Sequence, residues 1–210
     1  MENPVIIFGA KNLGKTVLDI FNRNEVLVYG FLEDDESLHG TEIGEVAVLG
    51  ATDNEGFTKL IGHKCEAFVA VEDRLERKSL VEFLHETRHV QPVNAVHPTA
   101  ILAEDAHIEH GNMIAAGVIV QPFAHIANHC LLHTGAIIDT EARLDDFVQV
   151  GAGSIVGAGA KLGENVFVGS GVTIVPGVEI GKNARIGAGS VVIENVAANA
   201  TVFGNPAKKV

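Results

Sequence analysis

Residues 148–192 read VQVGAGSIVGAGAKLGENVFVGSGVTIVPGVEIGKNARIGAGSVV, and this stretch places an aliphatic side chain at every sixth position. The repeat extends well before it. In steps of six from Val96 to Val192, all seventeen positions hold Val, Ile or Leu. Four residues after each of them the side chain is usually small, as at Ala100, Ala136 and Ser190. An amphipathic helix repeats near 3.6 residues and a half-buried strand at two, so neither explains a period of six.

A fixed period of six is typical of a β-helix, in which short strands wind into stacked coils. Three hexads make one triangular coil of eighteen residues, so residues 96–210 are predicted to form five to six coils. The glycines within 151–159, 163, 169–171, 181 and 187–189 are expected to form corners with positive φ. No hexad is interrupted, so any site must lie on the outer faces, between copies of the chain in a symmetric oligomer.

Composition narrows the class of protein and of ligand. The formal net charge is −12, and no basic stripe is present, so the sequence argues against nucleic-acid binding. A small anionic ligand stays compatible with this charge, because local amides and a few cations can hold it. Cys65 and Cys130 are too few for a disulfide framework. We see neither a signal peptide nor a membrane span, and expect a cytoplasmic protein.

Residues 1–95 differ from the repeat and alternate between strand-like and helix-like stretches. We expect strands at 4–9, 26–32, 46–49 and 67–71. Helices are expected at 15–24 and at 74–86, the second with Leu75, Val81, Phe83 and Leu84 on its apolar side. This alternation predicts a small parallel α/β sheet, Rossmann-like and about half the size of a full dinucleotide-binding domain. The boundary with the β-helix is predicted at residues 95 and 96.

The turn after the first strand reads GAKNLGKT from Gly9 to Thr16, which literally fits the P-loop pattern. A P-loop NTPase needs a larger domain for its metal and water-positioning groups, so a Rossmann-like glycine turn is the better interpretation. Such a turn holds a phosphate on its amides and on the N-terminus of the following helix. The predicted ligand contacts are Gly9, Lys11, Asn12 and Leu13 in the turn and Asp34 and Asp35 after the second strand. A tight turn followed by a solvated charge run is the alternative.

Histidines are concentrated early in the repeat, at positions 107, 110, 125, 129 and 133, all predicted to point outward. Stacking at eighteen residues puts His107, His125, Arg143, Lys161 and Glu179 in one outer column. A catalytic zinc site needs three converging protein ligands. His125, His129 and His133 are spaced by four residues and diverge on a coil, so no metal is predicted.

Three features together resemble one family: the hexapeptide run, the short α/β domain before it, and the ending GNPAK at 204–208. The chain resembles the bacterial sugar acyltransferases with a left-handed β-helix. Within them it resembles the sialic acid O-acetyltransferases and UDP-4-amino-sugar N-acetyltransferases of the bacillosamine and perosamine type. Further marks are GFLEDD at 30–35, VNAVHPTA at 93–100 and HTGAIID at 133–139.

The resemblance implies an acyltransferase that moves an acetyl group from acetyl-CoA to an amine or hydroxyl of a nucleotide-activated sugar, in surface-polysaccharide or glycan biosynthesis. It implies a homotrimer with acetyl-CoA between neighbouring β-helices and the nucleotide-sugar on the α/β domain of residues 1–95. The implied CoA contacts are Gly151, Gly169 and Gly187 on the β-helix and Gly204, Pro206 and Lys208 in the ending.

The chain departs from this family at three histidines. The family's general base lies in a stretch like I-x-H-[DE], and Thr140 stands there; Gln149 and Leu13 replace two further family histidines. A base near neutral pKa suits proton removal from the attacking group, which threonine cannot provide. His133 stands where the branch usually has Asn. We hypothesise that a neighbouring copy's His133 acts as base beside Thr140, oriented by Glu141.

Two alternatives remain open from the sequence. The chain is a catalytically impaired relative that binds CoA or nucleotide-sugar without turnover, or a zinc enzyme like the γ-class carbonic anhydrases, which share the β-helix. Ligand binding without thiol release favours the first alternative, and zinc in the purified protein favours the second.

Overall fold

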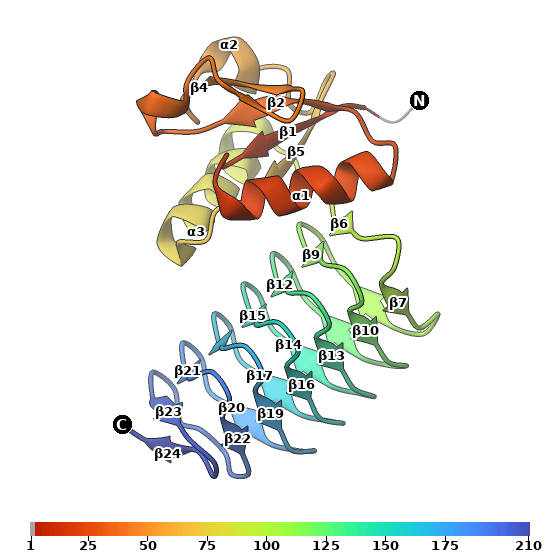
Figure 1. Cartoon of the computed structure of the whole chain (residues 1–210), viewed down its shortest axis with the longest axis vertical. Helices are drawn as coiled ribbons and strands as arrows, with labels where there is room; N and C mark the ends of the chain where they lie inside the picture. Colours follow the sequence, from red (N-terminus) through yellow and green to blue (C-terminus); the bar gives the residue numbers. More distant parts are fainter. Residues whose placement is uncertain (1–2) are drawn as a thin grey trace. The chain divides into compact units, whose positions relative to one another are not determined.

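The computed structural model describes residues 3–210 and divides the chain into two compact units, Met1–Ala95 and Val96–Val210. We call the first the α/β unit and the second the β-helix unit. Figure 1 shows the sheet and helices of the first unit and the stacked strands of the second. No helix among residues 3–210 is long and apolar enough to cross a membrane.

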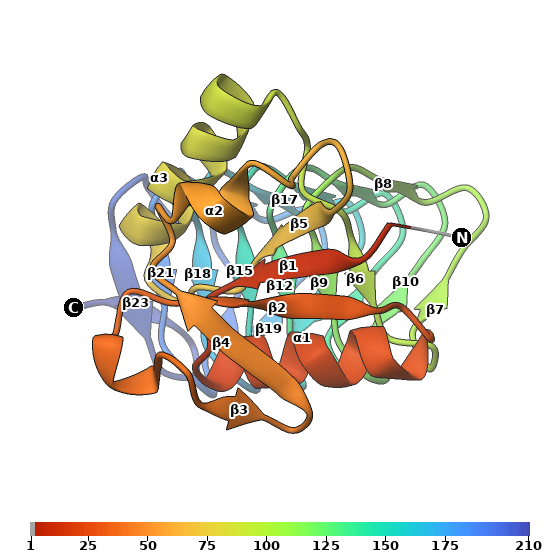
Figure 2. The same cartoon turned by 90° about the horizontal axis from the view of Figure 1, so that it is seen from above.

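The α/β unit is built on a five-stranded sheet with the order β3-β4-β2-β1-β5, and Figure 2 shows the last four lying side by side. Its strands are β1 (Val5–Phe8), β2 (Val28–Leu32), β3 (Glu42–Ile43), β4 (Val46–Gly50) and β5 (Glu66–Val69). Its helices are α1 (Asn12–Arg23), α2 (Glu55–Thr58) and α3 (Arg74–Phe83), with single turns at Glu36–Leu38 and Leu84–Arg88. β1 pairs in parallel with β2 and β5, as β2 does with β4, so the predicted parallel sheet is confirmed.

Three details of this unit differ from the prediction. A short strand, β3, precedes β4 and pairs with it in an antiparallel hairpin around Gly44. The last helix ends at Phe83 and continues as a wider turn rather than to residue 86. Leu75 is 69% exposed and not on the apolar side, because that side is formed by Val81 and Leu84 with the alkyl stem of buried Arg77.

The β-helix unit consists of three parallel sheets, each named here by its first strand. The β6 sheet contains β6 (Ala95–Val96), β9 (Met113–Ile114), β12 (Leu131–Leu132), β15 (Gln149–Val150), β18 (Phe167–Val168), β21 (Arg185–Ile186), β23 (Thr201–Phe203) and the antiparallel β24 (Lys208–Lys209). The β7 sheet contains β7 (Ile101–Leu102), β10 (Ile119–Val120), β13 (Ile137–Ile138), β16 (Ile155–Val156), β19 (Thr173–Ile174) and β22 (Val191–Val192). The β8 sheet contains β8 (His107–Ile108), β11 (His125–Ile126), β14 (Arg143–Leu144), β17 (Lys161–Leu162) and β20 (Glu179–Ile180).

Each strand pairs with the strand eighteen residues further along, as Ile119 does with Ile137 and His107 with His125. The predicted coil length and the outer column from His107 to Glu179 are therefore confirmed. The second residue of each strand points inward, and from Ile114 to Val192 these aliphatic side chains are at most 2% exposed. Their burial supplies the stability of the unit, at about 25 cal/mol for each Å² of apolar surface removed from water.

The corners recur with the same period of six, but the glycines with positive φ are not all the predicted ones. Every sixth residue from Gly111 to Gly189 has a positive φ, including the non-glycine residues Phe123, His129, Glu141, Phe147, Asn165 and Asn183. Gly151, Gly163, Gly169, Gly181 and Gly187, which were predicted to share this conformation, do not. These positions need glycine for another reason: the next coil packs so closely that a side chain would not fit. A Cβ atom on Gly151 would lie 2.5 Å from the carbonyl carbon of Gly169 and the amide nitrogen of Ser170.

These two uses of glycine predict different costs of substitution by alanine. Gly153→Ala meets no atom within 4 Å but keeps φ at +65°, so it should lower the free energy of unfolding by about 1 kcal/mol. Gly151→Ala forces two coils apart and should cost about 3 kcal/mol. Urea unfolding of both variants measures the difference. Equal losses would mean that the coils can separate locally without cost.

Candidate functional site

The turn between β1 and α1 is closed by two glycines that admit no side chain. Gly9 has φ of +101°, and a Cβ atom there would lie 2.5 Å from the carbonyl oxygen of Ala70. A Cβ on Gly14 would collide with the carbonyl oxygen of Gly9, so the helix packs directly on the turn. Helix α1 begins at Asn12, with no side-chain cap and no acidic residue in its first turn. Its first N–H groups thus have no side chain competing with a ligand.

A cavity of about 280 Å³ opens at this turn. Four of the predicted contacts, Gly9, Lys11, Asn12 and Leu13, line it together with Glu33, Ala70, Val71, Glu72, Asp73 and Glu76. Asp34 and Asp35, which were also predicted to contact the ligand, do not line this cavity. Asp34 accepts hydrogen bonds from the Thr52 amide and hydroxyl, both at 2.8 Å, and Asp35 caps the turn at Glu36–Leu38 through Ser37. Both carboxylates are thus bound to neighbouring residues.

Glu33 reaches the cavity but was not among the predicted ligand contacts. Its buried carboxylate accepts the Ala10 amide at 2.9 Å on Oε2 and the Asp35 amide at 3.1 Å on Oε1. The Lys11 ammonium lies 3.6 Å from Oε1. Glu33 therefore ties the glycine turn to the end of β2. Its position directly after a buried strand was the available signal.

The cavity is acidic. Of the residues that line it, Glu33, Glu72, Asp73 and Glu76 carry carboxylates, and Lys11 alone carries a cation. Burial, followed by the charges of Glu33, Asp34 and Asp73, raises the pKa of Glu76 above its usual value. Such a lining favours hydroxyl, amine and ring N–H groups, which donate hydrogen bonds, with an anionic group confined to the helix N-terminus and Lys11.

In the β-helix unit, His133 is held by Gln149. The Gln149 amide N–H donates to His133 Nε2 at 3.1 Å. With the amide nitrogen as donor, this contact favours the tautomer in which Nε2 accepts and Nδ1 carries the proton. Gln149 lies in β15, whose partner Leu131 comes two residues before His133. Gln149 therefore contacts the candidate base, although the eighteen-residue pairing alone places it opposite Leu131 and not His133.

Thr140 and Glu141 occupy the corner after β13, and His133 the corner before it. The Thr140 amide donates to the Asp139 carboxylate at 2.7 Å. Glu141 is exposed and has φ of +60°, a conformation that costs a non-glycine residue energy. His133 and the Thr140–Glu141 corner thus flank the same face, the β7 sheet, at its two edges.

The predicted CoA contacts fall into two groups. Gly151 and Gly169 are buried beneath the next coil, and Gly187 lies against the Phe203 ring, so the structure gives each a packing role. The ending is more open. Gly204 has φ of +105°, Asn205–Pro206 is a cis peptide, and exposed Pro206 and Lys208 follow on the surface. Lys208 pairs with Phe203 in the hairpin of β23 and β24.

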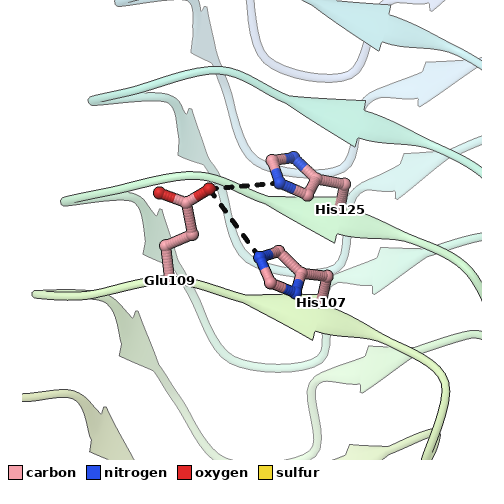
Figure 3. A group of neighbouring side chains, drawn as sticks. All are labelled: His107, Glu109 and His125. Atoms are coloured by element: carbon pink, nitrogen blue, oxygen red, sulfur yellow. Dashed lines mark ion pairs between the residues drawn. The ribbon is translucent and has the colours of Figure 1, made fainter.

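The outer histidines are arranged differently from the prediction. His129 is only 4% exposed and packs against Phe147, with ring centroids 5.0 Å apart, so its outward position was wrong. His107 and His125 stack with centroids 4.9 Å apart and both face Glu109 (Figure 3). Among residues 3–210, these three form the group whose potential metal-ligating atoms lie within 4.8 Å of one another.

The repeat and the coils define the class of protein. The sequence matches the bacterial transferase hexapeptide family (six repeats) over residues 159–194. The same repeat continues through the paired strands on either side of that segment. The chain therefore carries a hexapeptide repeat and consists of an α/β unit followed by a left-handed parallel β-helix, and the predicted fold class is confirmed.

Solved structures of other proteins are similar to this chain. A histidine-to-alanine variant of GDP-perosamine N-acetyltransferase from Caulobacter crescentus, in complex with CoA and GDP-perosamine, matches with 27% identity and a TM-score of 0.91, over 100% of this chain and 98% of that one. The acetyltransferase domain of PglB from Neisseria gonorrhoeae, in complex with acetyl coenzyme A, matches with 23% identity and a TM-score of 0.91 over 100% of both chains, which supports the fold alone. No protein of curated function matches the sequence. The resemblance to left-handed β-helix sugar acetyltransferases is confirmed.

The conformation of Glu141 yields a prediction about stability. Glu141→Gly removes the strain of a side chain at positive φ and should raise the free energy of unfolding by about 1 kcal/mol. Asp145→Gly is the control, because Asp145 is exposed in the same coil without a positive φ, and should lose about 0.5–1 kcal/mol. Denaturant unfolding measures both. A loss of stability in Glu141→Gly would show that the side chain makes contacts worth more than the strain.

Proposed function

We propose that this protein is a CoA-dependent acyltransferase that moves an acetyl group from acetyl-CoA to the amine of a nucleotide-activated sugar. One observation carries the proposal: both units match GDP-perosamine N-acetyltransferase over the whole chain, and the structures of that enzyme hold CoA together with GDP-perosamine. The N-acetyltransferases among the similar structures favour an amine over a hydroxyl as the acceptor. The reaction needs acetyl-CoA as co-substrate. Side chains of the protein, named below, carry out the proton transfers.

In this proposal the α/β unit binds the nucleotide-sugar. The cavity at Gly9, Lys11, Asn12 and Leu13 offers the helix N-terminus and Lys11 to a phosphate. Its carboxylates accept hydrogen bonds from hydroxyl and ring N–H groups of the sugar or nucleoside. Because Glu33 is committed to two backbone amides, its main role is to fix the turn against which the ligand lies.

The chemistry is attack of the sugar nitrogen on the thioester carbonyl carbon. A new C–N bond forms, the C–S bond breaks, and CoA leaves as the thiol after proton transfer. His133 Nε2 is assigned as general base, since it already accepts a hydrogen bond from Gln149. The attacking amine takes the place of the Gln149 amide as donor to that nitrogen. Before the amine arrives, the hydrogen bond from Gln149 holds the imidazole in the tautomer whose Nε2 can accept a proton.

The face between His133 and Thr140–Glu141 is suited to contact between copies. Its outward column is apolar except at Thr173, with Ile101 63% and Ile155 38% exposed, and its apolar members are Ile101, Ile119, Ile137, Ile155 and Val191. If three copies turn this face toward a common axis, the His133 edge of one copy meets the Thr140–Glu141 edge of the neighbouring copy. A neighbour's His133 then approaches Thr140 and Glu141. The homotrimer, with acetyl-CoA between its β-helices, is part of the proposal.

The proposal also covers the residues that contact CoA and the cellular compartment of the reaction. Pro206 and Lys208 are exposed in the C-terminal hairpin and are assigned to the adenine end of CoA, with Gly204 forming the bend. The rest of the cofactor is assigned to the exposed backbone directly after Gly151, Gly169 and Gly187, since the first two glycines are themselves buried. We place the reaction in the cytoplasm, where acetyl-CoA and nucleotide-sugars are available.

A second candidate function is binding without turnover. Thr140, Gln149 and Leu13 stand where the resembled family has histidines, which favours this alternative. The Caulobacter enzyme with a histidine replaced by alanine still holds CoA and GDP-perosamine, so binding on this scaffold does not require every histidine.

The two functions are separated by one pair of measurements. We expect thiol release from acetyl-CoA with at least one member of a panel of UDP- and GDP-linked 4-amino sugars. The same sugar and CoA should each raise the melting temperature, because a ligand that binds only the folded chain stabilises it. Thermal shifts without thiol release would establish binding alone. If no ligand shifts the melting temperature and no thiol is released, both functions are wrong.

The shared site predicts complementation between two inactive variants. His133→Ala and Glu141→Gln should each lower kcat by a factor of about 100 or more, because one removes the base and the other the group that orients it. Co-refolding the two variants should restore roughly one quarter of the sites, where an intact His133 meets an intact Glu141 of the next copy. His110→Ala, which changes an exposed histidine at the corner between the β8 and β6 sheets, is the control and should keep full activity. Unchanged turnover in His133→Ala, or no recovery on mixing, would refute the assignment.

A further inference from the structure

The pair of stacked histidines on the β8 sheet has no part in the proposed acyl transfer. His107 begins β8, His125 begins β11, and the two residues are register partners on adjacent coils. Their rings are parallel to within 7°. Nε2 of His125 lies 3.2 Å and Nε2 of His107 lies 3.8 Å from the same oxygen, Oε1 of Glu109 (Figure 3). Three potential ligand atoms thus converge from two coils.

The carboxylate of Glu109 is held in place from behind. Its other oxygen, Oε2, accepts a hydrogen bond from the Asn128 side-chain amide at 2.8 Å. Asn128 is itself fixed, because its backbone and side-chain N–H groups donate to the Asp146 carboxylate at 2.9 and 3.1 Å. Oε1 is left directed at the two imidazoles. Such an outer partner is what orients a metal-ligating carboxylate in proteins.

We propose that His107, Glu109 and His125 form a binding site for a divalent transition-metal ion, with Zn²⁺ as the ion that fits best. Zinc binds imidazole nitrogen and carboxylate oxygen at about 2.0–2.2 Å, which places neighbouring ligand atoms roughly 3.3 Å apart in a tetrahedron. The two Nε2–Oε1 separations, 3.2 and 3.8 Å, are close to this value, and the ligand nitrogens of the two histidines, which lie within 4.8 Å of each other, reach it when the stacked rings tilt toward the ion. Two imidazoles with one carboxylate favour zinc, cobalt or nickel over magnesium and calcium, which prefer oxygen ligands.

The site is open to solvent and complete within one chain. The His107 side chain is 68% exposed, that of His125 38% and that of Glu109 34%. Three protein ligands leave at least one position for water or another ligand. The ion would cross-link two successive coils at the N-terminal end of the β-helix unit. This set differs from the evenly spaced His125, His129 and His133, of which His129 is buried.

Titration of the metal-free protein with Zn²⁺ alone, followed by calorimetry and by elemental analysis after gel filtration, tests the site. We expect one ion for each chain and a higher melting temperature, since the ion binds the folded form. His107→Ala, His125→Ala and Glu109→Gln should each weaken binding at least about tenfold, and Asn128→Ala by about 10–100-fold. His110→Ala should bind as tightly as the parent chain, because His110 is exposed on the same coil but outside the cluster.

Substitution with Co²⁺ supplies a second readout. The ion should show visible absorption bands of a four- or five-coordinate site in the parent chain and in His110→Ala, and lose them in the His107→Ala/His125→Ala pair. Circular dichroism checks that every variant is folded, which the exposed outward positions of both histidines lead us to expect. Absence of stoichiometric binding in the parent chain would overturn the proposal, as would undiminished binding in the folded double variant.

Discussion

The eighteen-residue pairing between coils is the constraint on which the rest of the β-helix unit depends. Parallel strands only two residues long, such as β13 and β16, have no stability of their own and exist because each bonds to the coil before and the coil after. Interactions are confined to neighbouring coils, so the unit behaves as a one-dimensional array. Residues eighteen apart are thereby brought to about 4.8 Å, the ordinary spacing of strands. That pairing puts His107 on His125, and Leu131 opposite Gln149, close to His133.

The packing of glycine explains why the array keeps this spacing. At Gly151 and Gly169 the next coil approaches the main chain so closely that a methyl group has no room. At the corners the constraint is dihedral and not steric, and Phe123, His129, Glu141 and Phe147 satisfy it at a cost. Strained residues of this kind persist only where the surroundings hold them, and they are common at functional positions. Glu141, exposed and beside the candidate site, fits that pattern better than buried His129, whose packing on Phe147 accounts for its place.

The sequence predicted the fold far better than the site, for physical reasons that differ between residues. A period of six has one structural solution, so the coils, the inward column and the outer column could be predicted without coordinates. Strands of the α/β unit were predictable from apolar runs, whereas the two-residue strand β3 was not, because it depends on its hairpin partner. Asp34 and Asp35 were chosen from their position after a strand. Glu33 takes the central role because an unpredictable side-chain rotation brings it to the Ala10 amide. The approach of Glu109 to two histidines was missed because one of them, His107, is two positions away in sequence, whereas the other, His125, comes from the next coil.

The corner between the β6 and β7 sheets has a further consequence. Gly117, Gly135, Gly153, Gly171 and Gly189 succeed one another along it, each preceded by a small residue, so one edge of the β-helix unit bears only small side chains at its tip. A long, flexible ligand can lie along such an edge in close contact with peptide groups. Selection acting on recognition there would preserve bare main chain and leave no distinctive residue behind. Two relatives could therefore share a cofactor track while a search for shared chemical signatures finds nothing in common between them.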